Sequence, residues 1–363
     1  MGDYFNHLMD NLISATWRLL DLPMYALVLV LLLVFVLTYF LLLWILKKYR
    51  LGSKRILRIL LPVMGLILAS FIVDFKISQL KREVELINEK YMNFRSNEKL
   101  MLWDQQYDIH ELSEEFGKKL YLDQRYINEA SKLFILKSEN PKAVTFLTVT
   151  DLHHPGVEIK ITPELKAKYL TSKFAIEHDC YMAINGEAGE SMLPGCDLGE
   201  WTGNWIVNNN PVLLEDSDKR PFLSFSKNNQ ATYFKASVVD ITITDEKYNT
   251  IWGRFDILVD GEIQPDPNNR PYSRTIMGIC KEGRYLYLMI VDGKRPQYSL
   301  GLTLAESAHL LKLLGAWNVM SCDQGGSSCM YLSNYGGIIN RPADSDGTER
   351  VVYTHFGISL EQN

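Results

Sequence analysis

The feature of this 363-residue sequence that most limits how it can fold is an apolar run near its beginning. No charged residue occurs over residues 22–46, and a helix needs only roughly 20 apolar residues to cross a bilayer core. Buried helices of globular domains seldom run so far without a polar side chain. A cleaved signal peptide would carry a basic leader and a shorter apolar run. We therefore expect a retained transmembrane helix over about 22–46.

A second apolar run and the loop before it predict the topology. Residues 59–73 contain Pro62 and Gly65, both of which membrane helices tolerate. The charged residues of the loop are all basic, and short loops rich in Lys and Arg stay in the cytoplasm. They are Lys47, Lys48, Arg50, Lys54, Arg55 and Arg58. The sequence thus predicts a membrane anchor over residues 1–75, a hairpin with spans at about 22–46 and 57–74. It predicts a cell-membrane protein whose two termini and C-terminal domain are extracytoplasmic.

Residues 76–140 carry signals of a helical stalk or linker. Over residues 77–94 apolar side chains recur at alternating steps of three and four, as in a coiled coil. Self-association, docking on a membrane partner and packing on the rest of the chain all fit this stripe. A second helical stretch is expected over about 109–136, before the boundary signal Asn140-Pro141.

The remainder, residues 141–363, has the texture of a β-rich domain. Short β-branched or aromatic segments alternate with Gly, Asn, Asp and Pro, and Asp-Gly pairs at 260–261 and 292–293 indicate turns. One helix interrupts them, because Thr303 and Glu306 form a capping box and Gly315 ends the run. We expect an α+β fold, a sheet-dominated catalytic domain with a few packed helices.

The sequence contains no motif typical of cofactor binding or of nucleic-acid binding. The seven histidines show no HExxH or other paired spacing, and the five cysteines form no CxxC pair. We expect no cofactor, with calcium held by aspartate and backbone oxygens as the open alternative. Without a basic patch interleaved with aromatics, no nucleic-acid partner is expected. Disulfides are permitted outside the cytoplasm, so one or two bridges and five buried thiols both remain open.

The stretch richest in chemistry follows a predicted strand at 317–321. Asp323 and Gln324 precede two glycines and two serines at 325–328. The backbone N–H groups of such a loop can converge on an anion. A carboxylate at its mouth supplies the negative charge that a cationic sugar transition state needs. A polar turn is the plain alternative.

This stretch resembles the NLDGGGSSTM signature of the phosphodiester glycosidase family. Further segments resemble the family in the same order, namely residues 183–186, 205–214, 274–278, 288–293, 301–306 and 340–342 with Arg350. The resemblance covers roughly residues 143–359. Three departures put the sugar pocket in doubt: Gln324 replaces a glycine, Cys329 replaces a threonine, and Glu-Ala-Gly at 187–189 replaces Gly-Phe-Phe.

The resemblance implies roles for individual residues. Asp323 would be the nucleophile or the general base. Arg274 would clamp the phosphate with its planar guanidinium. Glu187 would be a second catalytic carboxylate, with a solvated turn as the alternative. Asn185 would hold sugar hydroxyl or acetamido groups. The substrate-binding set is completed by Gly186, Thr275, Gly325, Gly326, Ser327, Ser328, Asp292 and Arg341, and Asp292 fits a turn as well.

The expected function is therefore hydrolysis of, or transfer from, a sugar-1-phosphodiester, in the manner of a phosphodiester α-N-acetylglucosaminidase. The substrate would be an extracytoplasmic glycopolymer such as exopolysaccharide, capsule or teichoic acid. The second hypothesis is a non-catalytic or weakly active carbohydrate-binding subunit of a membrane glycan-assembly complex, which the anchor and the altered glycine favour. The implied partners are the glycan, the lipid bilayer, and either membrane assembly proteins or a second copy of the chain through residues 77–94.

Overall fold

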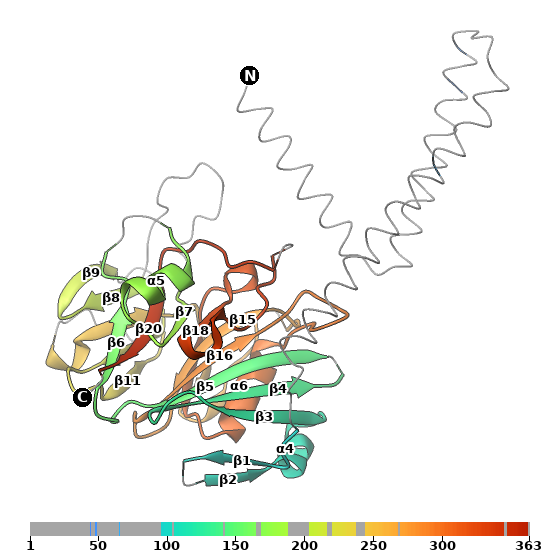
Figure 1. Cartoon of the computed structure of the whole chain (residues 1–363), viewed down its shortest axis with the longest axis horizontal. Coiled ribbons are helices and arrows are strands. Elements are labelled where there is room, and N and C mark those ends of the chain that lie inside the picture. Colours follow the sequence, from blue (N-terminus) through green and yellow to red (C-terminus); the bar gives the residue numbers. More distant parts are fainter. Residues whose placement is uncertain are drawn as a thin grey trace. The chain divides into compact units, whose positions relative to one another are not determined.

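The structure, a computed structural model, describes residues 96–361 except 104, 141, 165–167, 188–202, 216–219, 237–243, 268 and 345–346, and three single positions, 44, 48 and 65. Residues 95–363 form one unit, whose described elements are coloured in Figure 1. Apart from single positions, the predicted spans and the stripe at 77–94 lie outside the described residues. Within the described part of the chain, no helix is both long and apolar enough to cross a bilayer.

The unit is built on an eight-stranded antiparallel sheet with the order β14-β13-β17-β15-β16-β5-β4-β3. Its strands are β3 (Leu120–Tyr126), β4 (Ser131–Ser138), β5 (Ala143–Asp151), β13 (Phe255–Val259), β14 (Glu262–Ile263), β15 (Arg274–Ile279), β16 (Tyr285–Val291) and β17 (Asn318–Ser321). Figure 1 shows β3, β4, β5 and β16 side by side. Every residue of β5 is buried, so this strand is covered on both faces.

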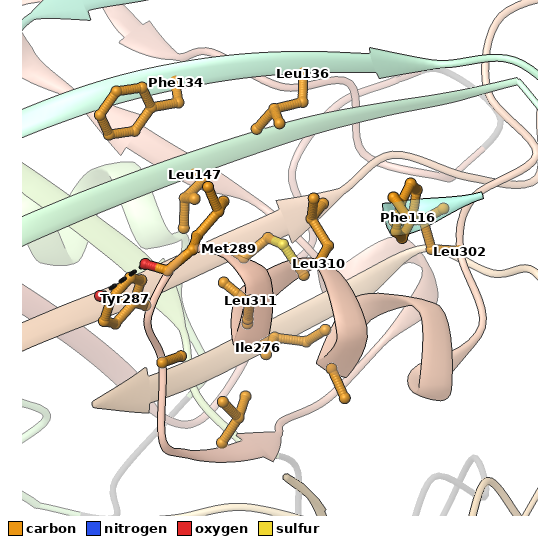
Figure 2. Packing of buried hydrophobic residues seen from close by; sticks show 14 of the residues in the cluster. Phe116, Phe134, Leu136, Leu147, Ile276, Tyr287, Met289, Leu302, Leu310 and Leu311 are labelled. Carbon is orange, nitrogen blue, oxygen red and sulfur yellow. Dashed lines mark hydrogen bonds between the residues drawn. The ribbon is translucent and has the colours of Figure 1, made fainter. Parts of the chain in front are cut away.

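Two helices cover one face of this sheet. They are α4 (Ile109–Phe116) and α6 (Leu304–Leu313), which contact each other. Figure 2 shows Leu310 and Leu311 of α6 beside Ile276 and Met289 of the sheet. The Tyr287 hydroxyl donates to the Leu314 carbonyl oxygen at 3.0 Å, which secures the end of α6 to β16.

Smaller sheets complete the unit, with the orders β19-β18-β7-β20-β6 and β11-β10-β12-β8-β9 and a hairpin β1-β2. Their strands are β1 (Lys99–Leu102), β2 (Gln105–Asp108), β6 (Val157–Ile161), β7 (Met182–Asn185), β8 (Gly203–Val207), β9 (Asn210–Glu215), β10 (Phe222–Phe225), β11 (Ala231–Phe234), β12 (Asn249–Trp252), β18 (Met330–Leu332), β19 (Gly337–Ile338) and β20 (His355–Leu360). Helix α5 (Thr171–Glu177) packs on β7, β18 and β20. The short 3₁₀ helices are η1 (Asp245–Lys247), η2 (Gly325–Ser327) and η3 (Ser333–Tyr335).

The sheet-dominated α+β fold is confirmed, and so is the Thr303–Glu306 capping box. The helix expected over 109–136 is right only for α4 and wrong beyond it. Gly117 adopts a left-handed conformation with φ +73 and ends α4, after which the chain forms β3 and β4. Both strands are mostly buried or half-buried, and β4 pairs with β3 on one side and with β5 on the other. The described part of 76–140 therefore comprises the β1-β2 hairpin, α4 and the two strands β3 and β4 at the edge of the large sheet rather than a helical stalk. It belongs to the unit that begins at 95 rather than at 141.

Four of the five cysteines are described, and all four are free and buried, namely Cys180, Cys280, Cys322 and Cys329. Burial raises the pKa of the Cys180 and Cys329 thiols to about 12. None of these four therefore forms a disulfide. Cys196 lies outside the described residues.

Candidate active site

The candidate site forms where the end of β17 meets the beginnings of its two antiparallel neighbours. Ser321, the last residue of β17, lies opposite both Phe255 of β13 and Ile276 of β15. Asp323, just beyond β17, is therefore brought to the segments that open β13 and β15. The Asp323 N–H donates to the carbonyl oxygen of Gly186 at 3.4 Å, which links the large sheet to the residues that follow β7.

Asn185, the last residue of β7, connects these segments with its side chain. Its Nδ2 donates to the carbonyl oxygens of Gly186 at 3.1 Å and Asp323 at 3.3 Å. Its Oδ1 accepts from the Thr275 hydroxyl at 2.7 Å and the Cys329 N–H at 3.2 Å. Two donors and two acceptor sites are all that an amide offers. Asn185 and Thr275 thus position the site, and this geometry leaves neither amide end of Asn185 for the sugar groups assigned to it from the sequence.

We expect Asn185→Ala to lower the free energy of unfolding by about 3 kcal/mol, because it leaves the buried Thr275 hydroxyl and Cys329 N–H without their acceptor. Urea denaturation of the purified chain measures this. Asn228→Ala, at an exposed turn, is the control and should change stability by less than about 0.5 kcal/mol. Equal stability of the two variants would contradict the connecting role of Asn185.

Glu187 is a buried carboxyl group, not the solvated turn residue that the sequence left open. It is 1% exposed, and its Oε1 accepts from Nε and Nη2 of Arg254 at 2.8 and 2.6 Å. Its Oε2 is buried and has no hydrogen-bond partner among the described residues. Burial raises the pKa of Glu187 to about 7, against the opposing effect of Arg254 and with a further increase from the negative charge of Asp323. Glu187 can therefore carry a proton near neutral pH.

Asp323 is the second buried carboxyl group of the site, at 3% exposure. Its Oδ1 accepts from the Gln324 N–H at 2.8 Å. Its charge adds to the raised pKa of both Glu187 and the neighbouring Cys322 thiol, for which burial is the main cause. A pair of interacting carboxyl groups, one of which holds its proton to higher pH, is the arrangement that general acid–base catalysis requires.

Arg274 is directed into the protein rather than toward an open site. It is 1% exposed, and it donates to the carbonyl oxygens of Leu302 at 3.2 Å and Arg270 at 2.9 Å. Its Nη1 donates to Oε1 of Gln324. Burial lowers the pKa of Arg274 to about 10. The guanidinium thus holds Gln324, the residue that replaces a family glycine, and this geometry does not favour the phosphate-clamping role assigned to Arg274 from the sequence.

The loop 325–328 is held by backbone and serine contacts. Gly325, with φ +81, donates its N–H to Ser273 O at 3.1 Å and accepts at its own carbonyl oxygen from the Ser273 hydroxyl at 3.1 Å. The Ser328 hydroxyl is buried and has no hydrogen-bond partner among the described residues. Ser327 Oγ accepts from Nη1 of Arg350 at 3.4 Å. The loop is thus held by Ser273 at Gly325 and contacts Arg350 at Ser327.

Asp292 is a buried structural residue that directly follows β16, and the turn expected at 292–293 is not formed there. It is fully buried, and its carboxylate accepts from the Tyr298 hydroxyl at 2.7 Å, Asn340 Nδ2 at 2.9 Å and the Arg341 N–H at 3.0 Å. These contacts secure the segment that contains Asn340 and Arg341. Among the predicted site residues, Glu187 and Asp323 are close enough for the charge of Asp323 to raise the pKa of Glu187. Asp292 instead stabilises the fold through its hydrogen bonds.

Three residues of the site had no role assigned from the sequence, namely Arg254, Asp344 and Arg350. Arg254 immediately precedes β13 and belongs to no motif, so only its pairing with Glu187 identifies it. Arg350 belongs to the closing segment of the family resemblance, which was the available signal. Asp344 accepts from Nε and Nη2 of Arg350 at 2.9 and 2.8 Å.

The chain resembles known proteins both in sequence and in fold. The phosphodiester glycosidase family matches residues 178–359. The catalytic domain of zebrafish N-acetylglucosamine-1-phosphodiester α-N-acetylglucosaminidase, auto-inhibited by its pro-peptide, is similar with a TM-score of 0.50 and 19% identity over 67% of this chain and 83% of that one. At this identity the likeness shows the fold.

Two further structures are more distant. A hypothetical protein from Synechocystis has a TM-score of 0.47 and 11% identity over 66% of this chain and 64% of its own. A putative exported protein from Burkholderia pseudomallei has a TM-score of 0.45 and 13% identity over 60% of this chain and 74% of its own. No curated protein sequence matches the chain.

Proposed function

This chain belongs to the phosphodiester glycosidase family, and on that premise we propose that it hydrolyses, or transfers a glycosyl group from, sugar-1-phosphodiesters. The observation that carries the proposal is the buried pair of Glu187 and Asp323, in which Glu187 has a pKa of about 7. A glycosidase needs one carboxyl group that can give a proton and one that can stabilise positive charge at the sugar.

The proposed reaction breaks the bond between the anomeric carbon and the phosphate oxygen. The bonding electrons leave with the phosphate, and protonated Glu187 donates its proton to the departing oxygen. Asp323 stabilises the oxocarbenium-like centre, either by attacking it or by taking a proton from the incoming water or acceptor hydroxyl. Arg254 fixes Oε1 of Glu187, so that Oε2 is the oxygen available to carry the proton.

Turnover of a chromogenic sugar-1-phosphodiester by the purified full-length chain tests this function. We expect release of the phosphomonoester from that substrate, and none from a chromogenic phosphodiester that lacks a sugar. Binding of the sugar phosphodiester without turnover would instead support a carbohydrate-binding accessory subunit. That second function is favoured by one observation: Gln324 stands where the family has glycine, and Arg274 holds its side chain.

We propose that the substrate is an extracytoplasmic glycopolymer and that the chain acts at the cell membrane. The support is the sequence: two apolar runs separated by a basic loop predict an anchor with the catalytic domain outside. A chain anchored beside growing polymer would meet repeated sugar-phosphate linkages. The stripe at 77–94 would bring it to a second copy or to membrane assembly proteins.

Cysteine labelling on intact cells tests this topology. Lys227→Cys places a thiol at an exposed position after β10, and Arg50→Cys places one in the basic loop. The four described cysteines are buried and can stay in place. Cys196 is replaced by serine so that it does not react with the label. An impermeant maleimide should label position 227 on intact cells and position 50 only after permeabilisation. The reverse pattern would overturn the proposed orientation.

A further inference from the structure

A carboxylate of the protein itself lies against the glycine turn beside Asp323. Asp344 accepts a two-pronged hydrogen bond from Arg350, with Nε and Nη2 at 2.9 and 2.8 Å from its two oxygens. The same arginine reaches Ser327 Oγ from Nη1 at 3.4 Å. A Cβ atom at Gly326 would collide with the Asp344 carboxylate, so the turn admits this group only because residue 326 is glycine.

Cationic side chains lie around this turn. Nζ of Lys294 lies 3.3 Å from the position that a Cβ of Gly325 would take and 4.5 Å from the centre of the Tyr272 ring. Arg295 donates from Nη2 to the backbone oxygen of Asp344. Three cationic side chains thus flank the turn, and among them Arg350 is the one that holds the Asp344 carboxylate.

Arg350 is also within electrostatic reach of the catalytic carboxyl group. Burial lowers the pKa of Arg350, but Asp344 and then Asp323 outweigh it, so the pKa is raised overall. Both Arg350 and Asp344 remain partly accessible, with side chains 37% and 35% exposed. The pair can therefore separate without unfolding the core, unlike the buried contacts of Arg274.

We propose that Arg350, with Ser327, the Gly326 turn and Lys294, binds the phosphate of the substrate, and that the Asp344 carboxylate occupies this site in the free protein. The inference rests on the proposed glycosidase function. A guanidinium fork binds carboxylate and phosphate with the same paired geometry. Glycine leaves space for a group as large as a phosphate oxygen beside the turn, and the serine hydroxyl can donate to it.

The occupied state has a measurable consequence. A phosphate must displace Asp344 before it can reach Arg350, so its apparent affinity is reduced by the fraction of protein in which the site is closed. Removing the carboxylate should therefore strengthen anion binding, whereas removing the fork should abolish it. A purely structural Asp344–Arg350 pair would show neither effect.

Calorimetric titration of the full-length chain with inorganic phosphate tests this. We expect Asp344→Ala to bind phosphate at least about tenfold more tightly than the unmodified chain. Adding Arg350→Ala to Asp344→Ala should remove the binding, and Ser327→Ala should weaken it. Asp151→Ala is the matched control, because it exposes an equivalent fork, that of Arg284, which bonds Asp151 from Nε and Nη2 at 2.9 and 2.7 Å.

The site is overturned if Asp344→Ala binds phosphate no more tightly than the unmodified chain, or if Asp151→Ala gains the same affinity. Folding of each variant is checked by circular dichroism, and an unfolded Asp344→Ala is replaced by Asp344→Ser. Failure of the glycosidase proposal gives a different result: phosphate binding that responds to Asp344 and Arg350 as expected, with no turnover of any sugar-1-phosphodiester.

Discussion

Asp323→Asn should reduce turnover of a sugar-1-phosphodiester by about a hundredfold or more, which corresponds to about 3 kcal/mol of lost transition-state stabilisation. Asparagine keeps the size of the side chain and can still accept from the Gln324 N–H at Oδ1. It removes the negative charge that attacks or stabilises the oxocarbenium-like centre. Because this charge acts most strongly in the transition state, kcat should fall more than KM rises.

The matched control is Asp123→Asn, which removes an equally buried charge far along the sheet. Asp123 is 4% exposed against 3% for Asp323, and it pairs with Arg125 at 2.9 and 2.7 Å on the edge strand β3. We expect this variant to lose stability while it keeps its rate per folded molecule. Near-normal turnover of folded Asp323→Asn protein would show that the catalytic centre is elsewhere.

Glu187→Gln should lower the maximal rate by about a hundredfold and change the pH dependence of the reaction. Glu187 acts as an acid, so the active form is protonated and activity should decline as pH rises through about 7. Glutamine cannot donate this proton, so the residual activity of the variant should no longer decline as pH rises through about 7. Rates measured from pH 5 to 9 show both effects.

The protonation of Glu187 should also make the free energy of unfolding depend on pH, with stability decreasing as pH rises. The folded-state pKa of about 7 lies above the ordinary value of 4.5. The contribution of Glu187 to stability is therefore fully present below about pH 4.5 and is lost as pH rises through about 7. Glu158→Gln is the control, because Lys160 lowers the pKa of Glu158, and this variant should keep the decline in activity at alkaline pH. If Glu187→Gln also keeps it, another group is the acid.

Local signals predicted the elements that depend on neighbours in the chain. The capping box at Thr303 and Glu306 and the strand before Asp323 are present where the sequence places them. The same holds for the turn after β13, where Asp260 and Gly261 both have positive φ. Capping and turn preferences depend on a few adjacent residues, so a single sequence carries them. The helix expected over 109–136 is wrong from residue 120 onward, because an apolar pattern fits helix and strand alike until long-range pairing selects one.

The chemistry of the site was decided at a longer range. The sequence by itself determined that Asp323 and its glycine–serine loop follow a strand, and it offered Glu187 only as one of two alternatives. Burial of Glu187 and its pairing with Arg254 arise from the antiparallel register of β13, β15 and β17 and from the contact with β7. Arg274 likewise turned inward because two backbone carbonyl groups and Gln324 meet it there. Solvent exclusion and opposing charges set a pKa, and both are properties of the folded arrangement that the order of residues does not display.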